Sequence, residues 1–444
     1  MQPSEKIREY SKAVCGQIQW EKAHAVVSEE IENHLADQRD AYMADGADEA
    51  AATEKAIVQM GDPVAVGIQL DRTHRPRPQW GMLALAAVFI CMGIALNIYF
   101  CWGTGHRWML DLFLLQAFGL AAMAGAYFLG FTWTGRYPRL LFILLMAFFT
   151  AAFALREATN LWYYASFIML LLPLGFAGLV YSLRNRGPIA ILLCEAVFLA
   201  PVLLLFIIEE GWLRSQCVLY TAAALVTLCV AVSKGWFRVK KRSGYGLVFI
   251  PIAVTLLTAL LIMSSNGRLE RMWGTFHLPY KGDGSYGWEG YFNEIQAALA
   301  GSKFIGHGVM SDGSISGPGT GLMHMLTSLI FYTGWISVIP VFGLLLLFIV
   351  KGFRLCFRQK NVLGLLVSVS IMMTLTMQTI CYVLLNFGLY LLSNISLPLI
   401  VQFSSWGYFV NMALVGLMLS VFRTGDAVRD RMIQKGRFID AAGA

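Results

Sequence analysis

Residues 362–390 read VLGLLVSVSIMMTLTMQTICYVLLNFGLY, twenty-nine residues without a charged side chain. A helix needs about 20 apolar residues to cross the roughly 30 Å hydrocarbon core of a bilayer. This stretch is long enough to do so. Nine further runs are also predominantly apolar and of similar length. They lie at 81–101, 108–130, 138–155, 162–182, 188–208, 216–234, 246–265, 321–350 and 397–422. The pattern predicts about ten membrane-spanning helices.

The composition favours the same class of protein. The chain has 444 residues, of which 57% are hydrophobic and 14% are charged. A soluble domain is about 45–50% apolar and about 25% charged. Too little polar surface remains to coat a water-soluble body, so we predict an all-α polytopic membrane protein. The first apolar run begins near residue 81, so no cleavable signal peptide is expected.

Basic residues gather in alternate loops. They are Arg136, Arg139, Arg184, Arg186, Lys234, Arg238, Lys240, Lys241, Arg242, Lys351, Arg354, Arg358 and Lys360. The tail adds more, whereas the opposite short loops hold one basic residue each or none. Cytoplasmic loops carry the excess of Lys and Arg. The asymmetry predicts that both termini are cytoplasmic, and it explains the net charge of +7 without a nucleic-acid partner.

Residues 1–78 differ from the rest because they are rich in charged side chains. Their pattern predicts a small cytoplasmic domain of three helices over 4–18, 20–45 and 48–60, ahead of the ten-helix membrane domain 79–444. The stretch 73–80 reads as a Pro/Arg linker. The chain holds eight Cys, mostly within apolar runs, so no disulfide framework is expected.

One predicted external loop, 266–320, is much longer than the others and is rich in Gly, Trp and Tyr. Long loops on a compact protein are usually functional. Its second half reads GYFNEIQAALA at 290–300 and then GSKFIGHG at 301–308. Downstream come TGWI at 333–336, NFG at 386–388, ISLP at 395–398, SSWG at 404–407 and GLMLSV at 416–421.

In order and spacing these segments resemble the SEDS family, the FtsW/RodA/SpoVE group of bacterial cell-wall and cell-division proteins. The resemblance is specific over about 268–422, and the ten-span layout with a large loop after the seventh span also fits. A second resemblance concerns the N-terminal domain. Its segments EEIENHL at 29–35, ADG at 44–46 and MGDP at 60–63 resemble the permease prefix domain, which implies protein contacts and no chemistry.

The SEDS resemblance implies polymerisation of lipid II, an undecaprenyl-linked precursor, together with a single-span transpeptidase partner. Such a reaction needs a base for the attacking hydroxyl and cations for the departing pyrophosphate. The family's proposed base is an Asp about eleven residues before the glycine matched by Gly334. That position is Met323 here, so the sequence departs from the family where the carboxylate is expected.

Three residues are candidate catalytic replacements: His324, Glu195 and Asp312. An imidazole acts as a base near neutral pH; the alternative for His324 is a helix-end side chain facing water or headgroups. A carboxylate within a span, as in Glu195, is costly and indicates function, the alternative being a hydrogen bond to a neighbouring helix. The alternative for Asp312 is a local turn cap.

The candidate substrate-binding residues are Arg271, Lys303, Gln296, Gly306, Gly308 and Asn386. Arg271 and Lys303 lie on the external loop, where cations would meet an anionic pyrophosphate, and the other four fall in the resembling segments. No cofactor is expected, apart from a divalent cation that would assist the chemistry.

Three hypotheses of function stay open at this point. The first is a diverged cell-wall glycosyltransferase. The second is a non-catalytic SEDS relative that serves as a scaffold for lipid II or a protein partner, which the missing Asp favours. The third is a small-solute transporter, because prefix domains precede permeases, although the sequence shows no inverted repeat.

Overall fold

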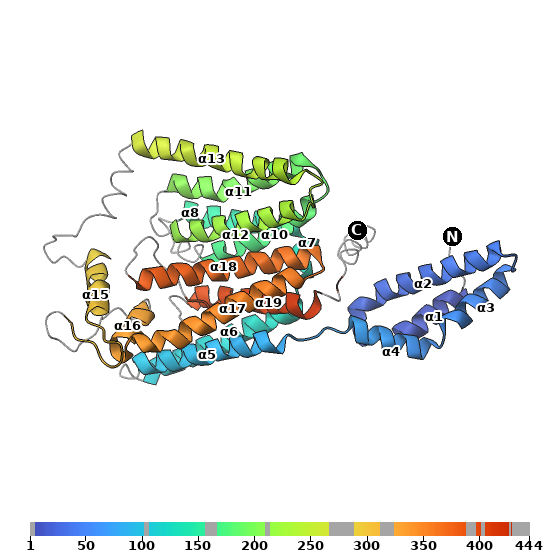
Figure 1. The fold of residues 1–444 in the computed structure, drawn as a ribbon, viewed down its shortest axis with the longest axis horizontal. Coiled ribbons are helices and arrows are strands. Elements are labelled where there is room, and N and C mark those ends of the chain that lie inside the picture. The colour runs from blue at the N-terminus through green and yellow to red at the C-terminus, as the bar shows by residue number, and fades with distance from the viewer. Residues whose placement is uncertain are drawn as a thin grey trace. The chain divides into compact units, whose positions relative to one another are not determined.

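The computed structural model describes residues 5–101, 106–155, 167–208, 214–265, 288–310, 324–387, 397–400, 405–425 and 428 (Figure 1). The chain divides into two compact units. The N-terminal unit comprises residues 1–79 with 359–361 and 422–444, and the membrane unit comprises 80–358 and 362–421. Every regular element in the described residues is a helix.

The described residues 5–79 of the N-terminal unit form four helices: α1 (Glu5–Cys15), α2 (Glu21–Ala44), α3 (Glu49–Met60) and α4 (Pro63–His74). α1 packs on α2 and α4, and α2 packs on α3. Apolar side chains at helical spacing fill the core, with Ile7 and Val14 of α1 against Val27, Ile31 and Leu35 of α2. This stripe of α2 is part of the periodicity that predicted the helix.

The three-helix prediction for this unit missed α4. The segment Gly61-Asp62-Pro63 ends α3 and also begins the next helix. The Asp62 side chain accepts a hydrogen bond from the Ala65 amide at 3.0 Å, and Pro63 occupies the first helical position. Asp before Pro is a helix start signal as well as a stop signal, so the sequence carried the information.

The membrane unit consists of α5 (Trp80–Cys101), α6 (His106–Leu129), α7 (Thr132–Arg136), α8 (Pro138–Ala154), η1 (Met169–Leu171), α10 (Leu172–Leu183), α11 (Pro188–Ile208), α12 (Arg214–Ser233), α13 (Lys241–Ser265), α15 (Trp288–Ala300), α16 (Met325–Thr333), η4 (Trp335–Ser337), α17 (Val338–Arg358), α18 (Val362–Asn386) and α19 (Ser405–Thr424). Among the residues that the structure describes, four helical stretches are long and apolar enough to cross a bilayer, and five shorter helices are also apolar. The predicted class, an all-helical polytopic membrane protein, is confirmed.

Helix α18, which lies within the uncharged stretch 362–390, is at the centre of this unit and packs on α10, α12, α16 and α17. The most apolar part of α18 is 72% buried within the protein. The most apolar part of the stretch Trp335–Arg358 is only 28% buried, so α17 lies at the periphery. One pair of interior polar side chains is mutually satisfied: Gln378 of α18 and Asn411 of α19 exchange amide hydrogen bonds at 3.0 and 3.1 Å. Unpaired polar groups in hydrocarbon would cost several kcal/mol each.

Two predicted spans are modified in the structure. The run 321–350 is not one helix: α16 ends before Gly334, whose φ is +96°, and α17 then continues to Arg358. The last span begins at Ser405 rather than at 397, because residues 397–400 form a buried turn in which Leu399 has φ +69°. Both changes arise from backbone conformations that apolar periodicity does not reveal.

Candidate functional site

The glycine-containing segment 301–309 lies against the C-terminal end of α16. The Gly308 amide donates to the Phe331 carbonyl at 2.8 Å, and the Gly306 amide donates to the Thr333 carbonyl at 3.2 Å. In the other direction, the Trp335 amide donates to the Lys303 carbonyl at 3.1 Å. α15, which precedes the segment, also packs on α16. The described part of the predicted external loop, 288–310, and the start of the eighth span therefore form one local assembly.

Glycine is required at two positions of this assembly by close backbone approach. A Cβ on Gly334 would lie 2.6 Å from the Phe304 carbonyl oxygen, and its φ of +96° is unfavourable for other residues. A Cβ on Gly308 would lie 2.8 Å from the Gly301 carbonyl oxygen and 2.9 Å from the Phe331 ring. The glycines that carry the SEDS resemblance thus hold the segment on α16.

Asn386, at the end of α18, caps the N-terminus of α16. Its Oδ1 accepts from the Leu326 amide at 3.1 Å and from the Thr327 amide at 3.2 Å. The Thr327 hydroxyl donates to the Asn386 carbonyl at 2.8 Å. The first amides of a helix lack partners within it, and His324, at the N-cap position, provides no side-chain bond. Sequence reasoning missed Thr327, whose only signal is its place in the first turn of α16.

His324 is 6% exposed at the start of α16. Its Nδ1 is buried and has no hydrogen-bond partner in the part of the chain that the structure describes. A buried imidazole nitrogen without a partner loses hydrogen-bond energy. Asn386 is close by, because it bonds the amides two and three residues after His324. These two of the predicted site residues are therefore brought together.

Four other predicted site residues belong to the α15–α16 assembly: Gln296 and Lys303 through their side chains, and Gly306 and Gly308 through their backbone. Gln296 on α15 and Lys303 after it both have exposed side chains. Gly306, with φ +90°, contributes its backbone. Gln296 and Lys303 are thus accessible to a ligand, whereas Gly306 and Gly308 act through their backbone.

Glu195 lies apart from this assembly, in α11, which packs on α10, α12 and α13. It is 2% exposed, and neither carboxyl oxygen has a hydrogen-bond partner within the described residues. The interhelical hydrogen bond that was the alternative to a functional role is not present there. Arg271, Asp312 and Met323 lie outside the described residues.

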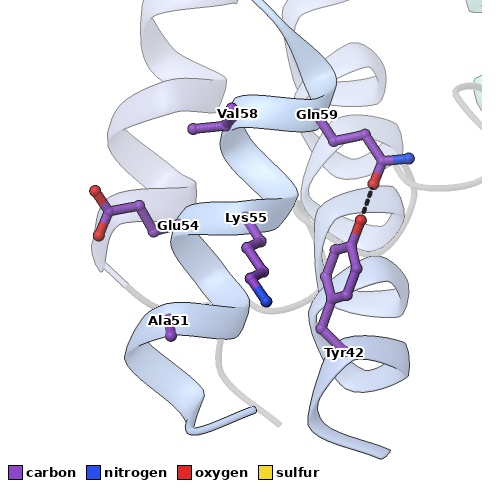
Figure 2. A pocket seen from close by; sticks show the side chains of 6 residues that line it. All are labelled: Tyr42, Ala51, Glu54, Lys55, Val58 and Gln59. Atoms are coloured by element: carbon purple, nitrogen blue, oxygen red, sulfur yellow. Dashed lines mark hydrogen bonds between the residues drawn. The ribbon is translucent and has the colours of Figure 1, made fainter. Parts of the chain in front are cut away.

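The described residues contain no group of three or more His, Cys, Asp or Glu side chains able to hold a metal ion. An open groove lies between α2 and α3 of the N-terminal unit, where the Tyr42 hydroxyl donates to Gln59 Oε1 (Figure 2). It is lined also by Ala51, Glu54, Lys55 and Val58. None of the predicted site residues lines it.

Most of the chain shares its fold with a chain of known structure. The chain matches a chain in the structure described as "Structural coordination of polymerization and crosslinking by a peptidoglycan synthase complex", with 17% identity, 78% of this chain and 98% of that chain covered, and a TM-score of 0.51. This match shows a shared fold, the one that the SEDS resemblance implies.

Two crystal structures of the Rod shape determining protein RodA of Thermus thermophilus, one of them a mutant, are also similar. The mutant is 15% identical, with 78% of this chain and 98% of that chain covered and a TM-score of 0.47. The other is 16% identical, with 78% and 97% covered and a TM-score of 0.46. No protein-family model and no curated protein sequence matches the chain.

Proposed function

We propose that this chain is a SEDS-type protein of bacterial peptidoglycan synthesis that binds lipid II in the cytoplasmic membrane. One observation carries the proposal. The separate segments of the sequence resemblance, 290–308, 333–336 and Asn386, join in a single assembly of α15, α16 and the end of α18. The fold shared with a chain of a peptidoglycan synthase complex supports the same reading. With the orientation from the basic loops, both termini are cytoplasmic.

The exposed side chains of the assembly suit an anionic, sugar-bearing ligand. The Lys303 ammonium is exposed and would pair with the pyrophosphate of lipid II, and the Gln296 amide would hydrogen-bond a sugar hydroxyl. Both lie on or directly after α15, which rests on α16. A transpeptidase with one span is the proposed partner, since the matched structure is described as coordinating polymerisation with crosslinking.

For polymerisation, His324 is the proposed general base. It precedes α16, one residue after the position where the family's proposed base is expected. The imidazole would take the proton of the attacking sugar hydroxyl as that oxygen bonds the anomeric carbon and the pyrophosphate leaves. Such a base contributes about 10²–10⁴-fold in rate.

The second candidate function is a non-catalytic scaffold that binds lipid II or a protein partner. Two observations favour it: Met323 stands where a carboxylate is expected, and His324 is 6% exposed. A base must reach the proton that it abstracts, and a side chain this buried does so only after rearrangement.

Fluorescent lipid II separates the two candidates. Purified protein, alone and with transpeptidase partners, is assayed for binding and for glycan polymer on a gel. For the polymerase, wild type and the control His34→Ala, on an exposed face of α2, form polymer, and His324→Ala forms at least tenfold less. Binding without polymer identifies the scaffold. Absence of both binding and polymer rejects the proposed function.

A further inference from the structure

The break between α16 and α17 leaves backbone groups that a continuous helix would pair. α16 ends with carbonyls that lack helical donors, and η4 begins with amides that lack helical acceptors. Both flanking segments are apolar, and the stretch Trp335–Arg358 qualifies as a membrane span. Non-helical backbone at this depth requires partners from the protein.

The segment 303–308 provides those partners. It donates to the end of α16 through the Gly306 and Gly308 amides, at 3.2 and 2.8 Å. It accepts from the start of the span through the Lys303 and Phe304 carbonyls, each at 3.1 Å, from Trp335 and Ile336. The turn is therefore fixed, through its backbone, at the very end of a membrane-spanning stretch.

Fixed in this way, the turn holds two large apolar side chains outward. Phe304 is 64% exposed and Ile305 is 66% exposed. The adjoining start of the span is likewise apolar and exposed, at Ile336 and Ile339. Only 28% of the most apolar part of that span is buried within the protein, so most of its surface is both exposed and apolar.

We propose that residues 303–305 form a lipid-inserted turn. Phe304 and Ile305 contact acyl chains as a continuation of the lipid-facing surface of α17. In the absence of lipid II, the exposed Lys303 ammonium, directly before them, reaches the headgroup phosphates, as Lys side chains do at membrane interfaces. This assignment does not depend on lipid II binding or on polymerisation.

Bilayer lipid is the occupant that the structure favours over a second protein. The apolar side chains continue an exposed face that is already apolar along α17, at Leu346 and Leu347 as well as at Ile339. A cation beside two apolar residues matches the boundary between headgroups and acyl chains. A partner helix or a second copy of the chain would instead bury both side chains away from lipid.

Spin labels test the assignment in reconstituted lipid nanodiscs. Single cysteines replace Phe304 or Ile305 in a background without native cysteines, with Ile339→Cys as the lipid-facing reference and Asn33→Cys, exposed on α2, as the aqueous reference. We expect labels at both test positions to resemble the label at position 339. After normalisation of each accessibility to its value at position 33, their accessibility to oxygen should exceed their accessibility to a water-soluble nickel complex several-fold.

Two results would overturn the assignment. Nickel accessibility equal to that at position 33 places the turn in water, and low accessibility to both reagents places it under protein. If a cysteine variant fails to fold, a photoreactive benzoyl-phenylalanine at position 304 replaces it. Crosslinks to acyl chains then support the lipid-inserted turn, and crosslinks to a protein reject it.

Discussion

Replacing Asn386 with alanine should weaken the contact between α18 and α16. The side chain bonds two amides of the first turn of α16, at Leu326 and Thr327, across about sixty residues of sequence. Alanine keeps the backbone carbonyl that accepts from the Thr327 hydroxyl at 2.8 Å. The substitution therefore removes the cap, together with the bond from the Asn386 side-chain amide to the Tyr382 carbonyl at 3.0 Å, and leaves the backbone carbonyl contact in place.

The expected loss is about 2–4 kcal/mol in the free energy of unfolding. A buried donor left without a partner costs about 1–3 kcal/mol. The substitution leaves two such donors, the amides of Leu326 and Thr327. Replacing an N-cap residue by alanine typically costs about 0.5–2 kcal/mol, so the expected loss lies below the largest value that two unpaired donors would give. Asn386 is itself 1% exposed, so water does not readily take its place.

The assay is thermal unfolding in detergent with a thiol-reactive dye, because Cys194, Cys356 and Cys381 are buried and become reactive only on unfolding. Ser370→Ala, also on α18, is the matched control. Ser370 is fully buried, and its hydroxyl has no partner in the described part of the chain. A fall in midpoint no larger for Asn386→Ala than for this control would refute the capping role.

Three further changes have directions set by the structure. Glu195→Leu should raise the unfolding midpoint, since it removes a buried carboxyl without a described partner; a lower midpoint would reveal an unseen partner. Gly334→Ala should cost about 1–3 kcal/mol from its positive φ alone, whereas Gly343→Ala, with open space around it, should be neutral or stabilising; equal effects would contradict this. Burial, then the charge of Glu32, raises the pKa of the Cys15 thiol. A single-cysteine variant should therefore react with maleimide at pH 8 more slowly when folded than in denaturant, with the rate rising toward higher pH; equal rates would refute this.

Much of the fold follows from apolar periodicity and length. The helix 362–390 was predicted, and the structure describes it as α18 over Val362–Asn386. The break at Gly334 and the turn at Leu399 were not predicted as such, because each depends on one residue with positive φ within an apolar run. α4 was readable from Asp62 and Pro63, but the same residues also end α3.

The candidate site was less predictable, because its contacts join distant parts of the sequence. Asn386 was singled out through the resemblance, but its bond to Thr327 depends on how α18 meets α16. Likewise, Gly308 was recognised as part of a motif, while its close approach to Gly301 and Phe331 appears only in three dimensions.

These contacts change what the resemblance supports. Gly308, Gly334 and Asn386 are each explained by the construction of the α15–α16 assembly, without a ligand or a reaction. A chain needs them to fold in this way whether or not it catalyses polymerisation. The matched segments are therefore stronger evidence for the fold than for activity. The proposed catalysis would depend instead on the residue just before α16 in the sequence, where Met323 replaces the expected carboxylate and His324 is the nearest titratable side chain. For that reason His324→Ala, measured against lipid II, is the experiment that separates enzyme from scaffold.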